Sequence, residues 1–183
     1  VVDVRPTTGD VLFKTNLVDQ VKFMYAWIGS NYTKVERTAT WDYLQAFVDE
    51  ARKQGLRIHA AINTFVGGNQ IDGGTGLLYR DQSKAEWATQ MNMQVGITSV
   101  MNTSESTKFF NPAHPEVQTF LCDLLKDLAG YDLDGIFLDR GRFLNLQADF
   151  SEESRKQFEE YMGGIRIQNY PNDILAPGAS SLP

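Results

Sequence analysis

The sequence is nearly free of cysteine and histidine. The single cysteine, Cys122, excludes an internal disulfide framework and any zinc site built on thiolates. The two histidines, His59 and His114, have no glutamate at helical spacing, so no recognisable metal motif is present. We therefore expect no metal site in this chain.

Positive charge and long apolar runs are also scarce. Seventeen Lys and Arg stand against 23 Asp and Glu, which leaves a net charge of −6. This balance argues against a nucleic-acid partner, because neutralising phosphates requires clustered positive charge. No apolar run approaches the roughly 20 residues of a membrane-spanning helix, so we expect no transmembrane segment.

What is present is the composition of one globular domain. The 183 residues are 42% hydrophobic, which is enough to build a buried core. The chain has no initiator Met and opens on a strand-like run, so we interpret it as a processed piece of a longer protein. We expect one domain over residues 1–168 and an irregular tail or severed connection over 169–183, where three of the six prolines lie.

Helices and strands alternate along most of the chain. Apolar spacing, capping residues and glycines predict helices over residues 40–55, 115–130 and 151–163. Thr40 is the expected cap of the first helix, and Trp41 lies on its apolar stripe, facing the core. Strand-like runs occupy residues 1–5, 57–65 and 135–139, which gives the βαβ rhythm of a parallel sheet. Residues 67–111 form a long excursion, with room for a small hairpin.

The three strands share a pattern of faces. One face of each is aliphatic, whereas the other becomes polar at the carboxyl end of the strand, at Arg5, Asn63 and Asp139. Polar residues at these ends fit a parallel (β/α) barrel, whose active site lies at that rim. The fold class predicted is therefore α/β of the TIM-barrel type, with only part of the barrel in this chain.

Several segments resemble a known family. The run 131–140 (YDLDGIFLDR) resembles the motif of the fourth strand in bacterial family-10-like glycosylhydrolases, which are α-amylase-type barrels. Further segments that resemble this family are 4–10, 55–63, 78–81 and 110–117. The resemblance implies that this chain carries strands two to four, with strand one before Val1 and strands five to eight beyond Pro183. One departure is Arg140, where the family commonly has a second acidic residue.

Asp139 is the first candidate for catalysis. It closes an apolar strand at the predicted rim, where a carboxylate is costly unless it has a function or a partner. Glycoside hydrolysis uses two carboxylates flanking the scissile bond. The resemblance implies that Asp139 is the nucleophile, and the alternative is a structural ion pair with Arg140 or Arg142.

Four further residues are candidates for substrate binding. Arg5 and Asn63 end their strands at the same rim, where they can hold a sugar hydroxyl or form a hydrogen-bond network without ligand. Arg140 and Arg142 lie in the loop after Asp139, and loops at this place in barrels build specificity. A structural pairing with Asp149 is the alternative for this loop.

Other conspicuous residues have simpler interpretations. Asp132 and Asp134 precede their strand, so we expect them in a turn at the opposite end of the barrel. Aromatic residues of the long loops suit either sugar stacking or buried anchoring: Trp27, Tyr79, Trp87, Phe109 and Phe110.

The resemblance implies a glycoside hydrolase that acts on poly- or oligosaccharide through carboxylate chemistry. It implies a secreted, periplasmic or cell-surface location and no organic cofactor. One alternative is a barrel that binds carbohydrate without catalysis, and another is a barrel hydrolase of a different class. The sequence leaves the oligomeric state and the identity of the second carboxylate open.

Overall fold

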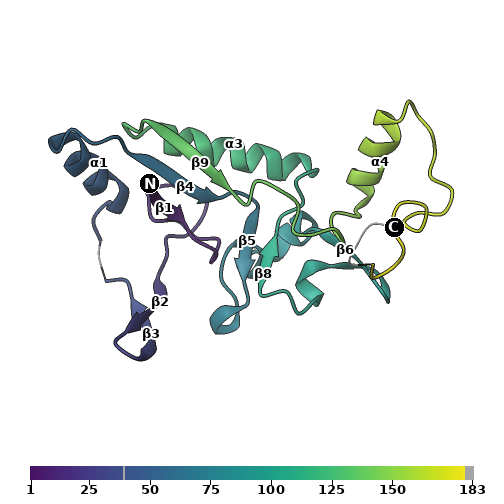
Figure 1. Cartoon of the computed structure of the whole chain (residues 1–183), viewed down its shortest axis with the longest axis horizontal. Helices are drawn as coiled ribbons and strands as arrows, with labels where there is room; N and C mark the ends of the chain where they lie inside the picture. The colour runs from purple at the N-terminus through teal and green to yellow at the C-terminus, as the bar shows by residue number, and fades with distance from the viewer. Residues whose placement is uncertain (39, 180–183) are drawn as a thin grey trace.

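The centre of the molecule is a three-stranded parallel sheet (Figure 1). The computed structural model describes residues 1–38 and 40–179. The strand order is β1-β4-β9, and the strands are β1 (Val2–Arg5), β4 (His59–Asn63) and β9 (Gly135–Asp139). Both pairings are parallel, which confirms the sheet predicted from the alternation of strands and helices.

Three helices follow the predicted order: α1 (Tyr43–Lys53), α3 (Pro115–Ala129) and α4 (Glu152–Tyr161). Pro115 begins α3, as predicted, and the Ser151 hydroxyl caps α4 by accepting a hydrogen bond from the backbone N–H of Ser154 at 3.2 Å. The predicted cap of α1 is wrong. Asp42, two residues after Thr40, accepts the capping bond from the Gln45 N–H at 3.1 Å.

Because the helix starts later than predicted, the expected position of Trp41 on its buried face is also wrong. The residue precedes α1 instead of lying on its apolar stripe, and its side chain is 54% exposed. The buried face of α1 begins with Leu44 and continues with Val48. Both a Thr and an Asp are good N-caps, so the choice between them is made by packing rather than by local preference.

The hydrophobic core lies between the sheet and the helices. Side chains from β1 and β4 pack against those of α1 and α3 in one cluster that includes Val4, Ile62, Leu44, Val48, Val117, Leu121 and Leu124. The opposite face carries Asn63 and Asp139, whereas a register shift after Asp3 places the buried Arg5 level with Ile62. At the edge of the sheet, Phe137 and Leu138 of β9 stay 58% and 51% exposed.

The predicted excursion between β4 and α3 is confirmed, with more regular structure than the sequence indicated. It holds two antiparallel pairs, β5 (Val66–Asn69) with β8 (Thr107–Phe109) and β6 (Gln90–Met93) with β7 (Gly96–Ser99). Short helical turns connect them: η1 (Ile71–Gly73), α2 (Leu77–Arg80), η2 (Gln82–Trp87) and η3 (Val100–Asn102).

Aromatic side chains fasten this excursion to α3. The rings of Trp87 and Phe110 are both buried, and both lie within 6 Å of the ring of Phe120 on α3, at 5.5 and 5.7 Å. Phe109 is also buried. Three of the loop aromatics are therefore structural anchors, the second of the two uses predicted for them.

One element is absent from the sequence prediction, the antiparallel hairpin of β2 (Phe23–Ile28) and β3 (Asn31–Glu36). It projects from the body of the molecule below α1 in Figure 1. Gly29 takes a left-handed backbone conformation with φ of 62°, which a two-residue hairpin turn requires. The run of six apolar residues in β2 hides the period of two that normally marks a strand.

The carboxyl-terminal part surrounds a buried carboxylate. Glu159 of α4 accepts hydrogen bonds from the Ile167 N–H at 3.0 Å, from Arg166 at 2.7 Å and from Arg155 at 3.1 Å. Its side chain is 4% exposed. Beyond it, residues 169–179 contain neither helix nor strand, and the Asn92 amide donates to the Leu175 carbonyl at 2.9 Å.

The Glu159 contacts predict an acid-dependent loss of stability. Hydrogen bonds, first that of Ile167 and then that of Arg166, lower the pKa of Glu159 to about 2. An unfolded glutamate has a pKa of about 4.3, so the stabilisation is complete above that pH and disappears as pH falls toward 2. We expect Glu159→Gln to be less stable at neutral pH and to show a flatter decline in this window. Urea midpoints measured across pH test this, and parallel declines of both proteins would contradict it.

Candidate active site

The carboxyl ends of β1, β4 and β9 lie together at one edge of the sheet. Asn63 pairs in register with Asp139, and Arg5 pairs with Asn63's neighbour Ile62. The three residues predicted to share a rim therefore do so. In a parallel sheet this edge is where side chains from separate strands converge.

Asp139 is exposed at this edge and is held through the backbone. Its Oδ1 accepts a hydrogen bond from the Arg140 N–H at 2.7 Å, and its carbonyl accepts one from the Thr64 N–H at 2.7 Å. Within residues 1–38 and 40–179, no ion pair joins Asp139 to Arg140 or Arg142. The structural alternative for Asp139, an ion pair with either arginine, is thus not observed in that part of the chain.

Arg5 is fully buried, and its guanidinium group bonds to backbone carbonyls. It donates hydrogen bonds to the carbonyl oxygens of Asn63, Thr64 and Val66, at and beyond the end of β4. In return the Asn63 side-chain amide donates to the Arg5 carbonyl at 2.8 Å. Burial lowers the pKa of Arg5 to about 10. Arg5 and Asn63 therefore form the hydrogen-bond network at the rim that the sequence left as one alternative.

The loop after Asp139 carries the two other predicted arginines. Arg140 has a left-handed backbone with φ of 47°, which turns the chain sharply out of β9. Arg142 is exposed and donates to the carbonyls of Phe143 and Leu144 at 3.0 and 2.8 Å.

Asp149 is not the partner of this loop. Its Oδ1 accepts hydrogen bonds from the Thr89 hydroxyl at 2.8 Å and from the Gln90 N–H at 2.6 Å. Its Oδ2 accepts from the Ser154 hydroxyl at 2.7 Å. Asp149 thus joins β6 to the start of α4.

A second carboxylate, Asp3, lies on the same face of the sheet. In register, Asp3 pairs with Ala61, and Ala61 pairs with Phe137, two residues before Asp139. Asp3 and Asp139 therefore point to the same side, on opposite sides of β4. Asp3 is exposed and accepts a hydrogen bond from the Arg5 N–H at 3.1 Å. Partial desolvation raises the pKa of Asp3 against the effect of that bond, and the negative charge of Asp139 adds to the increase. The alternation of side chains in residues 1–5 predicts the face on which Asp3 lies. Its nearness to Asp139 depends on the strand order and has no signal in the sequence.

Asp132 and Asp134 lie at the other end of the sheet, as predicted. Asp134 accepts a hydrogen bond from the Ile58 N–H at 2.7 Å, just before β4 begins. Arg52 of α1 donates to Asp132 at 2.7 Å and to Asp134 at 2.8 Å. These contacts fasten the end of α1 to the start of β9, so both aspartates are structural.

The sequence comparisons identify the family. The sequence model of the family described as glycosyl hydrolase-like 10 matches residues 2–172. The chain belongs to this family. A curated relative, an S-layer-related protein of Niallia circulans, is 33% identical over 142 residues. That match covers 73% of this chain, whereas the chain spans only 9% of the relative's length.

Membership of the glycosyl hydrolase-like 10 family confirms the resemblance found from the motifs. The mixed α/β structure with a parallel sheet is compatible with a glycosyl hydrolase-like fold. Among the described residues, no helix is long and apolar enough to cross a membrane. In the same residues, no group of three His, Cys, Asp or Glu side chains is placed to hold a metal ion.

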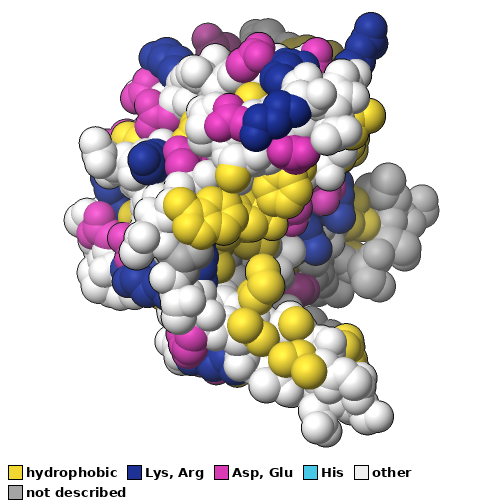
Figure 2. Space-filling view, turned by 90° about the vertical axis from the view of Figure 1, so that its left-hand side faces the viewer, with side chains coloured by type: hydrophobic (Ala, Val, Ile, Leu, Met, Phe, Trp, Pro, Cys, Tyr) yellow, Lys and Arg dark blue, Asp and Glu magenta, His cyan; other side chains and the backbone are white. Residues whose placement is uncertain are grey.

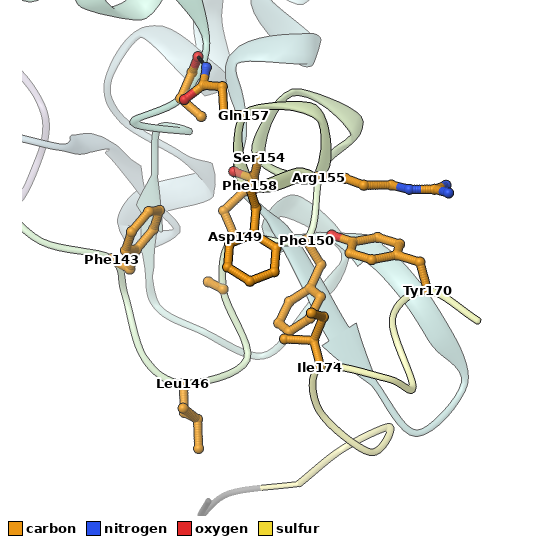
Figure 3. A pocket seen from close by; sticks show the side chains of 12 residues that line it. Phe143, Leu146, Asp149, Phe150, Ser154, Arg155, Gln157, Phe158, Tyr170 and Ile174 are labelled. Carbon is orange, nitrogen blue, oxygen red and sulfur yellow. Dashed lines mark hydrogen bonds between the residues drawn. The ribbon is translucent and has the colours of Figure 1, made fainter. Parts of the chain in front are cut away.

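A hollow of about 360 Å³ lies beside the loop that follows Asp139 (Figure 3). Phe143 and Leu146 of the loop border it together with Phe158 of α4 and Tyr170 and Ile174 of the tail. The sequence analysis did not single out these residues. Their spacing along the chain carries no signal, because they come together only when the tail returns to α4.

Proposed function

We propose that the site at the carboxyl edge of the sheet belongs to a glycoside hydrolase that acts on poly- or oligosaccharide. The observation that supports this most strongly is the pair of carboxylates, Asp3 and Asp139, on one face of the sheet with β4 between them. Glycosidases need two carboxyl groups flanking the scissile bond. Membership of a glycosyl hydrolase-like family points to the same chemistry.

The two carboxyl groups are both exposed, and they take different roles in this proposal. Partial desolvation raises the pKa of Asp3 against the lowering effect of its hydrogen bond from the Arg5 N–H, and the charge of Asp139 adds to the increase, which favours the protonated form and suits a general acid. Asp139 is exposed at the carboxyl end of β9, where its carboxylate is open to a bound substrate and water. We assign Asp3 as the acid and Asp139 as the carboxylate that activates water or stabilises positive charge on the sugar.

The spacing of the strands favours inversion of configuration. Neighbouring strands lie about 4.8 Å apart, and Asp3 lies level with Phe137, two residues or roughly 6.6 Å before Asp139, so the backbones at Asp3 and Asp139 are separated by roughly 11–12 Å, a gap that the two side chains can shorten. Inverting enzymes have carboxyl groups roughly 6.5–9.5 Å apart, which leaves room for a water molecule, whereas retaining enzymes have them roughly 5–5.5 Å apart. In this proposal Asp139 acts as the base for that water rather than as the nucleophile that the resemblance implied.

The other predicted residues take supporting roles. Arg5 and the buried Asn63 bond to each other, and in this way they hold the end of β4, the strand that lies between the two carboxylates. Arg140 and Arg142 lie in the loop that continues from Asp139, where their charges suit contacts with sugar hydroxyls or with acidic groups of a glycan. No organic cofactor takes part in this chemistry.

The surrounding fold and location are also part of the proposal. We propose that β1, β4 and β9 are strands two to four of a (β/α) barrel over residues 1–168, followed by a tail that is irregular over its described part, residues 169–179. Strands β1 and β9 are the two edges of the sheet, which suits continuation in both directions. The S-layer-related relative favours a cell-surface location.

Hydrolysis of a polysaccharide panel tests this function directly. We expect new reducing ends from at least one polysaccharide, and the first product resolved by proton NMR to have the inverted anomeric configuration. A product of retained configuration would assign the nucleophile to a closer carboxylate and contradict the pairing of Asp3 with Asp139. Binding without any hydrolysis would favour the alternative of a barrel that only binds carbohydrate.

The pH profile of Asp3→Asn tests the role of Asp3. A general acid must be protonated, so the wild-type rate is expected to fall as pH rises through the raised pKa of Asp3. In Asp3→Asn this alkaline decline should disappear and the rate should fall about a hundredfold or more. Substrates with a good leaving group need no acid, so their hydrolysis should be largely preserved. An unchanged alkaline limb would exclude Asp3 as the acid.

A further inference from the structure

The hairpin of β2 and β3 carries a row of aromatic rings on one face. The register places Phe23, Tyr25 and Trp27 of β2 opposite Glu36, Lys34 and Tyr32 of β3. Because alternate residues of a strand point to the same side, these six side chains share one face. We call Tyr25, Trp27 and Tyr32 the aromatic strip.

The strip is ordered by stacking but stays open to solvent. The Tyr25 and Tyr32 ring centroids are 5.3 Å apart with an angle of 23° between the planes, and Trp27 lies 5.3 Å from Tyr32. Trp27 is 71% exposed and Tyr32 is 58% exposed. The strip therefore ends in an indole that has Tyr32 on one side and most of its surface free.

Polar contacts fix the strip at its base. Asp72, in the turn η1, accepts a hydrogen bond from the Tyr25 hydroxyl at 2.8 Å and pairs with Lys34 at 2.8 Å. The Lys34 ammonium also lies 4.2 Å from the Phe23 ring centroid and 3.2 Å from a Glu36 carboxylate oxygen. The rings are held in position before any ligand arrives, which reduces the entropy lost on binding.

The opposite face of the hairpin belongs to a different surface. Met24 and Val35 border a small apolar hollow together with Trp41 and Tyr43, near the start of α1. Figure 2 shows hydrophobic side chains on the projecting hairpin and a larger group on the body above it. The hollow also reaches Phe23 and Glu36 at the base of the hairpin, but none of the three rings of the strip lines it, so Trp41 beside this hollow provides a control.

We propose that the aromatic strip binds a glycan chain, whose pyranose rings stack on Trp27 and Tyr32 while hydroxyl groups bond to the charged groups around Asp72. The ligand class rests on the carbohydrate substrate of the proposed function, but the binding does not require Asp139. Sugars present C–H groups on the ring faces and hydroxyls around the rim, which matches aromatic rings that end on fixed charges.

The size of the strip favours a glycan over a protein partner. A standard protein interface uses about 20–30 residues on each side, whereas the strip has three rings on a two-stranded ribbon. The two strands lie about 4.8 Å apart, so the strip has room for a single glycan chain.

Retention on insoluble polysaccharides tests the proposal. The probes are cellulose, chitin and xylan, and the protein carries Asp139→Asn so that cleavage does not release it. We expect retention on at least one probe, and a decrease of about tenfold or more in its apparent affinity when Trp27→Ala is added. The control is Trp41→Ala, because Trp41 is the other well exposed tryptophan and lies outside the strip. It should leave retention unchanged.

The outcomes separate this proposal from the proposed function. Retention that depends on Trp27, in a protein that hydrolyses nothing, would support the strip and contradict the hydrolase. Hydrolysis with retention that is insensitive to Trp27 would overturn the strip and leave the hydrolase. Absence of retention on all three probes would overturn it too, as would a Trp27→Ala effect confined to self-association measured by size-exclusion chromatography.

Discussion

Asp139→Asn is expected to lower turnover about a thousandfold or more while leaving the melting temperature nearly unchanged. Asn has almost the same shape as Asp and still accepts the hydrogen bond that the Arg140 N–H donates to Oδ1. It has no negative charge, so it cannot activate water or stabilise an oxocarbenium-like transition state. The exposed position and the lack of an observed ion pair predict little effect on folding.

Turnover on a cleaved polysaccharide and thermal unfolding of the same preparation check this expectation. Asp49→Asn is the matched control, because Asp49 is exposed on α1 and lies outside the site. It should leave both measurements unchanged. If Asp139 instead had only a structural role, its variant would melt earlier and turn over normally per folded molecule. Wild-type turnover in Asp139→Asn would exclude the catalytic assignment.

The sheet and its helices were predictable because their signals are local. Pro115 begins α3, and Gly55 follows the end of α1 with a φ of 65° that few other residues tolerate. The cap of α1 was not predictable in the same way. Thr40 and Asp42 are both suitable caps, and Asp42 also accepts a hydrogen bond from Tyr131, 89 residues along the chain, at 2.7 Å. The local sequence around residues 40–42 cannot predict a contact with a residue so far along the chain.

The candidate site shows the same division. The shared edge of Asn63 and Asp139 follows from strand direction alone, since parallel strands end together. The burial of each side chain at that edge cannot be predicted from strand direction. Arg5 is fully buried because it bonds to carbonyls 58 to 61 residues away. The closeness of Asp3 and Asp139 required both the strand order and the register.

Arg5 links the fold to the site. Its guanidinium group joins β1 to three backbone carbonyls at and just beyond the end of β4, those of Asn63, Thr64 and Val66. A planar group with several fixed donors suits this arrangement, whereas the single ammonium of a lysine does not. The segment that Arg5 holds leads directly from Asn63 into β5, so the position of the rim between the two carboxylates depends on it.

Arg5→Met is therefore expected to destabilise the protein by about 3–5 kcal/mol, because it leaves three buried carbonyl groups without their donor. For a chain of this length the melting temperature should fall by about 10 °C or more. Arg5→Lys should recover only part of the loss, since it restores the charge but not the fork.

Urea and thermal unfolding measure these changes, with Arg57→Met as the matched control. Arg57 is exposed before β4, at the opposite end of the sheet from the rim, and its replacement should cost less than about 0.5 kcal/mol. Equal stability of Arg5→Met and Arg57→Met would show that the Arg5 hydrogen bonds do not hold the end of β4. The rim would then need another support, and the positioning role assigned to Arg5 would be wrong.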